Sequence, residues 1–192
     1  NIHFKNPTRK DMQWTKKRGL YFDITDQEAL SLDPDWLQTL DRVNLVYRTL
    51  CGILYNFVPT SGHPGGSISS GHIDQALMFD VMNYDIANPD EMASDLLVYA
   101  AGHKAMGLYA AWALRNELMR AYHEKELPKE KWQLRLEDLL GFRRNPTQGT
   151  PLFTKYNAKP LDGHPTTSAP FVKIATGASG VGVTTACGLA LG

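Results

Sequence analysis

A short apolar run that leads into a helical pattern constrains the fold of this chain more than any other feature. Residues 96–99 read LLVY, the run stops at Gly102-His103, and apolar side chains then recur at helical spacing as far as Leu114. This order is typical of a buried parallel strand followed by a helix. The first turn of a helix has unpaired backbone N–H groups and the positive end of the helix dipole, so it favours an anion such as diphosphate. We therefore expect His103 to donate to an anion, although a turn histidine satisfied by the backbone or by water fits this stretch equally well.

Composition and charge narrow the class of protein. Of the 192 residues, 43% are hydrophobic and 21% are charged, which is typical of a soluble globular domain and not of a disordered or membrane-spanning chain. Lys plus Arg and Asp plus Glu each total 20, so no overall field attracts nucleic acid or a membrane surface, and the ligand is expected to be small. Cys51 and Cys187 lack metal-ligand spacing. As reduced thiols in a chain without a secretory segment, they predict a cytoplasmic location.

The chain is expected to consist of an arm and one domain. Residues 1–32 are polar and irregular, which predicts an arm that lies over a larger surface. The domain is expected over residues 33–192. It begins with Asp33-Pro34, a helix start, and apolar residues recur at helical spacing until Pro59, which predicts a long, mostly buried helix. A glycine-rich loop and a further helix precede the apolar run described above, and this order predicts an α/β layer arrangement.

The carboxyl-terminal part contains two loops of unusual composition. Residues 151–170 form a loop that is too long for a simple connector. Residues 174–192 read IATGASGVGVTTACGLALG, which predicts a glycine-spaced loop and then a helix of small residues packed closely against another backbone, as at a subunit or domain face. The glycine spacing departs from the dinucleotide fingerprint, so this is a weak nucleotide motif. Because the sequence starts without methionine and stops inside an apolar run, we expect it to be part of a longer chain.

Three histidines lie in glycine-adjacent loops, namely His63, His103 and His164. Such loops are expected to meet at one edge of an α/β sheet, where ligands bind. Imidazole can both move protons and donate to anions near neutral pH. A metal site is a less favoured alternative because the chain lacks the close histidine pairing of a helix-borne zinc site. A catalytic serine triad is also less favoured, because the sequence contains no G-x-S-x-G motif. Three turn histidines without a shared function are the remaining alternative.

Four motifs that include these histidines follow one another along the chain. They are SGHPG at residues 61–65, the segment 95–103, GHP at residues 163–165 and TGASG at residues 176–180. In this order and at this spacing, residues 35–192 resemble the amino-terminal half of the transketolase family. The resemblance implies a three-layer α/β thiamine-diphosphate-binding fold with a mostly parallel sheet, in which residues 33–192 hold the diphosphate.

The resemblance also implies roles for individual residues. His103 would contact the diphosphate, while His63 and His164 would be catalytic residues that face the thiazolium and the sugar substrate. A loop near the cofactor would be formed by Gly177, Ala178 and Ser179. The family usually has Pro-Leu where this chain has Ala178-Ser179.

The implied cofactors are thiamine diphosphate and Mg²⁺. In the family, a GDG pattern followed by an asparagine binds the metal ion after this region, so the Mg²⁺ ligands are expected beyond residue 192 and none is assigned within the chain. The glutamate that activates the aminopyrimidine lies in a second, pyrimidine-binding domain. The 192-residue chain alone is therefore expected to be inactive.

The implied function is transfer of a two-carbon ketol unit between sugar phosphates, as in pentose phosphate metabolism, by a cytoplasmic homodimer. One alternative is a 2-oxoacid dehydrogenase or decarboxylase component of the same superfamily. Residues 95–111, DLLVYAAGHKAMGLYAA, are also similar to the first component of homodimeric pyruvate dehydrogenase. A non-catalytic scaffold subunit is an alternative from another class.

Overall fold

The computed structural model describes residues 33–57, 64–144, 146–147 and 149–191, together with the backbone of two strands. By its internal contacts the chain divides into two compact units, residues 1–37 and residues 38–192. The strands β1 (Met12–Thr15) and β2 (Gly19–Phe22) belong to the first unit and pair in antiparallel register, with Met12 opposite Phe22. The segment expected to be irregular therefore contains a short hairpin. The residues of β1, MQWT, alternate apolar and polar side chains, which is the period of a strand.

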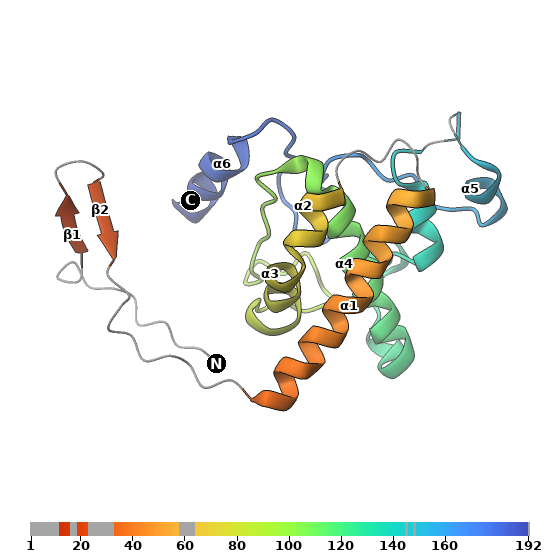
Figure 1. The fold of residues 1–192 in the computed structure, drawn as a ribbon, viewed down its shortest axis with the longest axis horizontal. Helices are drawn as coiled ribbons and strands as arrows, with labels where there is room; N and C mark the ends of the chain where they lie inside the picture. The colour runs from red at the N-terminus through yellow and green to blue at the C-terminus, as the bar shows by residue number, and fades with distance from the viewer. Residues whose placement is uncertain are drawn as a thin grey trace. The chain divides into compact units, whose positions relative to one another are not determined.

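Six α-helices and five shorter helical turns are described (Figure 1). The α-helices are α1 (Pro34–Phe57), α2 (Pro64–Ser69), α3 (Gly71–Ala76), α4 (Ala105–Tyr122), α5 (Pro151–Lys155) and α6 (Val181–Leu191). A π-helical turn, η1 (Leu77–Val81), extends α3, and the 3₁₀ turns are η2 (Gly102–Lys104), η3 (Glu124–Glu126), η4 (Glu130–Trp132) and η5 (Leu136–Gly141). None of the described helices combines the length and the apolar character needed to cross a membrane.

The amino-terminal end of α1 confirms the predicted helix start. Asp33 Oδ1 accepts a hydrogen bond from the backbone N–H of Asp35 at 2.9 Å, and Pro34 occupies the first helical position, where its missing N–H is not needed. The helix ends at Phe57, before Pro59 as predicted.

The prediction that α1 is mostly buried is wrong. Tyr47, Cys51 and Leu54 are buried, but Val46 and Ile53 are 47% and 46% exposed. The apolar residues of α1 cover more than one face of the helix, and only the face that contacts α2, α3 and α4 is buried. Tyr47 Oη donates to the backbone carbonyl of Ser67 at 2.8 Å and so ties this face to α2.

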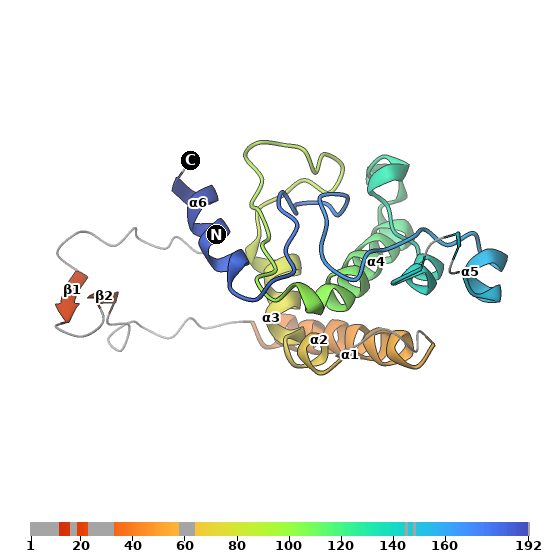
Figure 2. The same ribbon diagram turned by 90° about the horizontal axis from the view of Figure 1, so that it is seen from above.

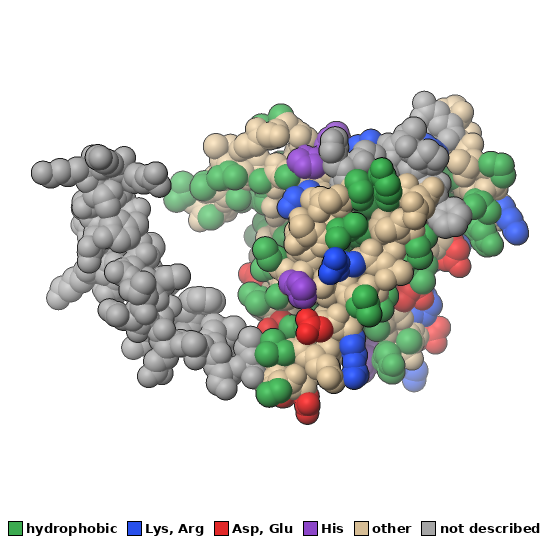
Figure 3. Space-filling model, in the orientation of Figure 1, with side chains coloured by type: hydrophobic (Ala, Val, Ile, Leu, Met, Phe, Trp, Pro, Cys, Tyr) green, Lys and Arg blue, Asp and Glu red, His purple; other side chains and the backbone are tan. Residues whose placement is uncertain are grey.

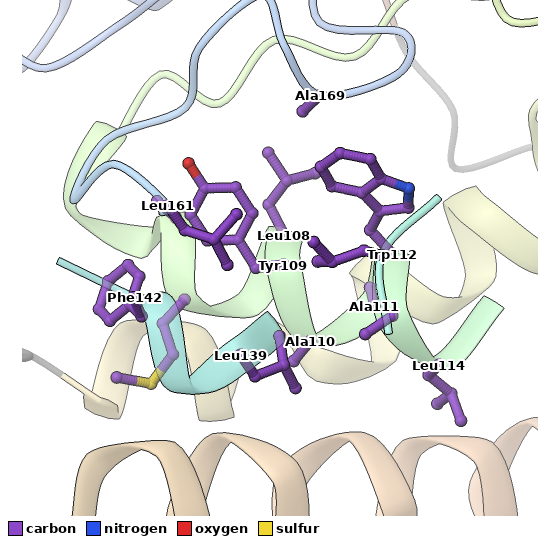
Figure 4. Close-up of a cluster of buried hydrophobic side chains, with 14 of the residues drawn as sticks. Leu108, Tyr109, Ala110, Ala111, Trp112, Leu114, Leu139, Phe142, Leu161 and Ala169 are labelled. Carbon is purple, nitrogen blue, oxygen red and sulfur yellow. The ribbon is translucent and has the colours of Figure 1, made fainter. Parts of the chain in front are cut away.

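Helix α4 lies at the centre of the core, as the helical pattern after residue 103 predicts. Every residue from Ala105 to Asn116 is buried. Figure 2 shows α1 and α2 on one side of α4 and the loops that precede η2 and α6 on the other side. In Figure 4, the side chains of Leu108 and Tyr109 lie among residues from distant parts of the chain, such as Phe142 and Leu161. A helix buried all round explains why its sequence is apolar on nearly every face.

The predicted parallel sheet is not confirmed. In the part of the chain that the structure describes, residues 96–99 belong to no strand, and they share one backbone–backbone hydrogen bond with a neighbouring segment, from Leu97 N to Phe171 O at 3.0 Å. Phe142 and Leu161 form an isolated parallel bridge. A buried parallel strand needs backbone partners for its N–H and C=O groups along its whole length, and the described segments beside residues 96–99 supply only this one backbone–backbone bond.

Candidate functional site

Two of the predicted site segments meet at the turn before α4. A Cβ atom on Gly102 would lie 2.8 Å from the backbone N of Gly177 and from the carbonyl oxygen of Thr176, so only glycine allows this approach. Thr176 Oγ1 also donates to the carbonyl oxygen of Tyr99. The segment that contains His103 and the loop that contains Gly177 are therefore in direct backbone contact.

The third segment, around His164, joins the same cluster. The His164 ring lies against Gly177, because a Cβ atom on that glycine would be 3.5 Å from the His164 Cδ2 atom. The carbonyl oxygen of His164 accepts a hydrogen bond from Tyr109 Oη, in α4, at 3.2 Å. Burial raises the pKa of Tyr109, and the charge of Asp162 raises it further, so the phenol stays protonated and remains a donor.

His103 is exposed in η2, directly before the first residue of α4. The prediction that a helix begins just after this histidine is confirmed. One backbone N–H of the first turn is already satisfied, because Gly107 N donates to Ser67 Oγ at 3.2 Å. Since Ser67 Oγ in turn donates to the carbonyl oxygen of Lys104 at 3.2 Å, α2 is fixed against the start of α4.

The glycine-rich loop reaches this site through its second half. A Cβ atom on Gly66 would lie 3.3 Å from the Lys104 side chain, which places the start of α2 beside η2. His63, the third predicted histidine, lies outside the described residues. The structure thus brings the segments of His103 and His164 together and gives no position for His63.

The loop before α6 presents the remaining predicted residues. Gly177 is half-buried, whereas Ala178 and Ser179 are exposed. At the start of α6, Gly182 is buried, and a Cβ atom there would lie 2.3 Å from Ala100 Cα, as expected for close backbone packing. The rest of α6 is mostly exposed, and Figure 3 shows hydrophobic side chains gathered over it.

A polar hollow of about 540 Å³ lies beside His164 and contains two arginines that the sequence analysis missed. Its lining includes Arg143, Arg144, Asp162 and His164. Arg143 reaches this place because its backbone N donates to the carbonyl oxygen of Leu161 at 2.7 Å, next to the isolated bridge. Two adjacent arginines are visible in the sequence, but this pairing joins segments about twenty residues apart, and no local pattern reveals it.

No protein-family model matches the chain, but the similar proteins described here are all named transketolase or transketolase-like protein. The chain is 32% identical to transketolase of Homo sapiens over 165 residues, which are 86% of this chain and 21% of that protein. It is 31% identical to transketolase-like protein 2 of Mus musculus over 159 residues, covering 83% of this chain and 21% of the relative. Transketolase of Aquifex aeolicus is 31% identical over 162 residues, covering 82% of this chain and 20% of the relative.

A solved structure supports the same relationship. The chain superimposes on transketolase from Leishmania mexicana with a TM-score of 0.56 and 26% identity, over 79% of this chain and 19% of that one. The chain spans about a fifth of the length of the curated relatives that it matches. Similarity over most of its sequence, together with the shared fold, establishes that this chain is a homologue of the transketolases.

Proposed function

We propose that this chain is the part of a transketolase-like enzyme that holds the diphosphate of thiamine diphosphate. The observation that carries the proposal is the meeting of three segments at the start of α4, where Gly102, Gly177 and His164 are in contact. The chain is homologous to transketolases, so the proposed reaction is transfer of a two-carbon ketol unit between sugar phosphates.

The residues present fit an anionic group. His103 is exposed on the turn before an 18-residue helix, whose positive dipole end favours negative charge. The close backbone approach at Gly102 leaves the loop of residues 177–179 next to this turn, with Ser179 exposed. We assign His103 to the diphosphate, as a hydrogen-bond donor, and Gly177, Ala178 and Ser179 to the loop that faces the cofactor.

The chain's own residues would bind and orient the cofactor and the substrate, and they would transfer protons. Thiamine diphosphate, when bound, supplies the electron sink that carbon–carbon bond cleavage requires. His164 and His63 would hydrogen-bond the substrate oxygens and exchange protons with them, since an imidazole side chain can both donate and accept a proton. Arg143 and Arg144 share the hollow with His164, and their charge would attract the phosphate of a sugar-phosphate substrate.

The remaining parts of the proposal concern the whole protein. We place the Mg²⁺ ligands and the pyrimidine-binding domain outside the 192 residues, and we expect a cytoplasmic homodimer in which the isolated 192-residue chain is inactive. The 2-oxoacid dehydrogenase alternative is not favoured, because the relatives found are named transketolase or transketolase-like protein.

The test is a calorimetric titration of thiamine diphosphate, with Mg²⁺, into the full protein. We expect His103→Ala to weaken binding about ten- to a hundredfold, as a lost charge-assisted hydrogen bond would. His123→Ala is the matched control, because His123 is also exposed but follows the opposite end of α4. Equal affinity in the wild type and His103→Ala would remove His103 from the cofactor site. Absence of any binding by the wild type would favour a non-catalytic scaffold.

A further inference from the structure

Arg115, in the third turn of α4, is a buried cation without a hydrogen-bond partner. Its side chain is 3% exposed, and none of its three guanidinium nitrogens has a partner in the structure. It lies about 15 Å along the helix from Ala105, at a rise of about 1.5 Å per residue. Arg115 is therefore remote from the site at the start of α4. An unpaired buried charge is costly, and most buried charges in proteins are paired.

Two aromatic rings compensate the charge only in part. The Arg115 guanidinium lies 4.9 Å from the centre of the Phe171 ring and 5.5 Å from that of Tyr84. The Tyr84 hydroxyl donates to the carbonyl oxygen of Met78. Burial lowers the pKa of Arg115 and outweighs the opposing effect of Tyr84. The guanidinium therefore lies close to two aromatic rings, while its three nitrogens have no hydrogen-bond acceptor in the structure.

An apolar hollow of about 520 Å³ lies beside this arginine. Arg115 contributes to its wall, together with Phe79, Leu118 and three methionines, Met78, Met82 and Met119. This volume is within the range of about 300–1,000 Å³ that is usual for small-molecule sites. The guanidinium nitrogens are covered, but methionine side chains have three rotatable bonds and adapt readily to a ligand.

The same arginine also borders a much smaller internal cavity. That cavity has a volume of about 10 Å³, which is room for at most one water molecule. One water cannot satisfy the several donors of a guanidinium. The larger hollow, whose wall includes Arg115, has room for a ligand that carries a negative charge.

We propose that this hollow binds a small amphipathic carboxylate, with its apolar chain along the methionine-rich wall and its carboxylate paired with Arg115. A carboxylate matches the planar guanidinium in a bidentate pair. The apolar wall selects a ligand whose body is a hydrocarbon chain or an aromatic ring. A medium-chain fatty acid has both features, and the site is separate from the one proposed for thiamine diphosphate.

The test uses three probes on the full chain: octanoate, the uncharged 1-octanol and the short acetate. We expect calorimetry to show octanoate binding about ten- to a hundredfold more tightly than 1-octanol, as a charge-assisted pair implies, with acetate weakest. In Arg115→Met, the difference between octanoate and 1-octanol is expected to disappear. The control Arg48→Met removes an exposed arginine of α1 and is expected to leave all three affinities unchanged.

A second variant guards against a folding defect. Methionine in place of an unpaired buried cation is expected to keep or raise the melting temperature, which thermal unfolding checks. Leu118→Trp narrows the hollow while Arg115 stays, and it is expected to weaken octanoate binding at least tenfold. Equal affinity for octanoate and 1-octanol, no octanoate binding by the wild type, or unchanged binding in both variants overturns the proposal.

Discussion

The contact between Gly102 and the loop at Gly177 can be tested by adding one methyl group. In Gly102→Ala, the new Cβ atom would lie 2.8 Å from Gly177 Cα, Gly177 N and Thr176 O. All three are backbone atoms, which cannot rotate away as the end of a side chain can. The loop of residues 176–179 would have to move away from η2, and overpacking of this kind costs about 1–3 kcal/mol.

This cost predicts a measurable change in melting temperature. For a chain of this size, 1 kcal/mol corresponds to about 2–4 °C, so Gly102→Ala is expected to lower the melting temperature by about 2–12 °C. The measurement is thermal unfolding of the full chain followed by circular dichroism. The same variant is expected to weaken thiamine-diphosphate binding in the full protein, because the displaced loop contains Gly177 and Ser179.

Gly52→Ala is a matched control that is expected to change the melting temperature in the opposite direction. Gly52 lies inside α1, and a Cβ atom there would have no other atom within 4 Å. Alanine in a helix interior is about 0.5–1 kcal/mol more favourable than glycine, so this variant is expected to raise the melting temperature. If Gly102→Ala is as stable as the wild type while Gly52→Ala behaves as expected, the close approach that organises the site is refuted.

Two further predictions concern ionisable groups. Burial acts to raise the pKa of Asp138, but hydrogen bonds from the Arg135 side chain and from the backbone of Arg135 and Lys159 outweigh it and hold this pKa below its usual range. The Asp138 carboxylate therefore stabilises the fold at pH values above the pKa of an unfolded aspartate, and this stabilisation is lost as the pH falls through the lower pKa of the folded state. Urea unfolding at a series of pH values should show this loss in the wild type and should not show it in Asp138→Asn. Burial raises the pKa of Cys51 to about 12, so mass spectrometry after iodoacetamide treatment at pH 8 should show the exposed Cys187 alkylated and Cys51 unmodified. Equal labelling of both thiols in the folded chain would contradict the burial of Cys51.

Local signals in the sequence predicted the starts of α1 and α4, but the expectation that residues 151–170 form only a loop is wrong, because α5 (Pro151–Lys155) lies there. The start of α1 could be predicted because Asp33 and Pro34 act within one turn of the helix. The start of α4 after His103 could be predicted from the change in apolar spacing. The extent to which α1 is buried could not be predicted, because it depends on which face of the helix meets distant segments. Val46 and Ile53 lie on another face and are exposed.

Pairing between distant segments explains what the sequence did not reveal. An apolar run such as residues 96–99 is compatible with a buried strand, but a strand also needs backbone hydrogen bonds to neighbouring strands. Among the described residues, the run has one backbone–backbone bond of this kind, from Leu97 N to Phe171 O. The loops of His103 and His164 were expected to meet because both are glycine-adjacent, and the family resemblance implied that Gly177 lies near the same cofactor. The position of Arg143 beside His164 was not expected, because it is set by the hydrogen bond between the Arg143 backbone and Leu161.

We propose that the full protein transfers ketol units with the help of this site. The most direct test is steady-state kinetics of the full protein, with saturating thiamine diphosphate and Mg²⁺, on a ketose phosphate donor and an aldose phosphate acceptor. We predict cofactor-dependent turnover in the wild type and a kcat/KM lower by about 10²–10⁴-fold in His164→Ala, with cofactor affinity retained. No turnover by the wild type, or wild-type rates in His164→Ala, would contradict the account.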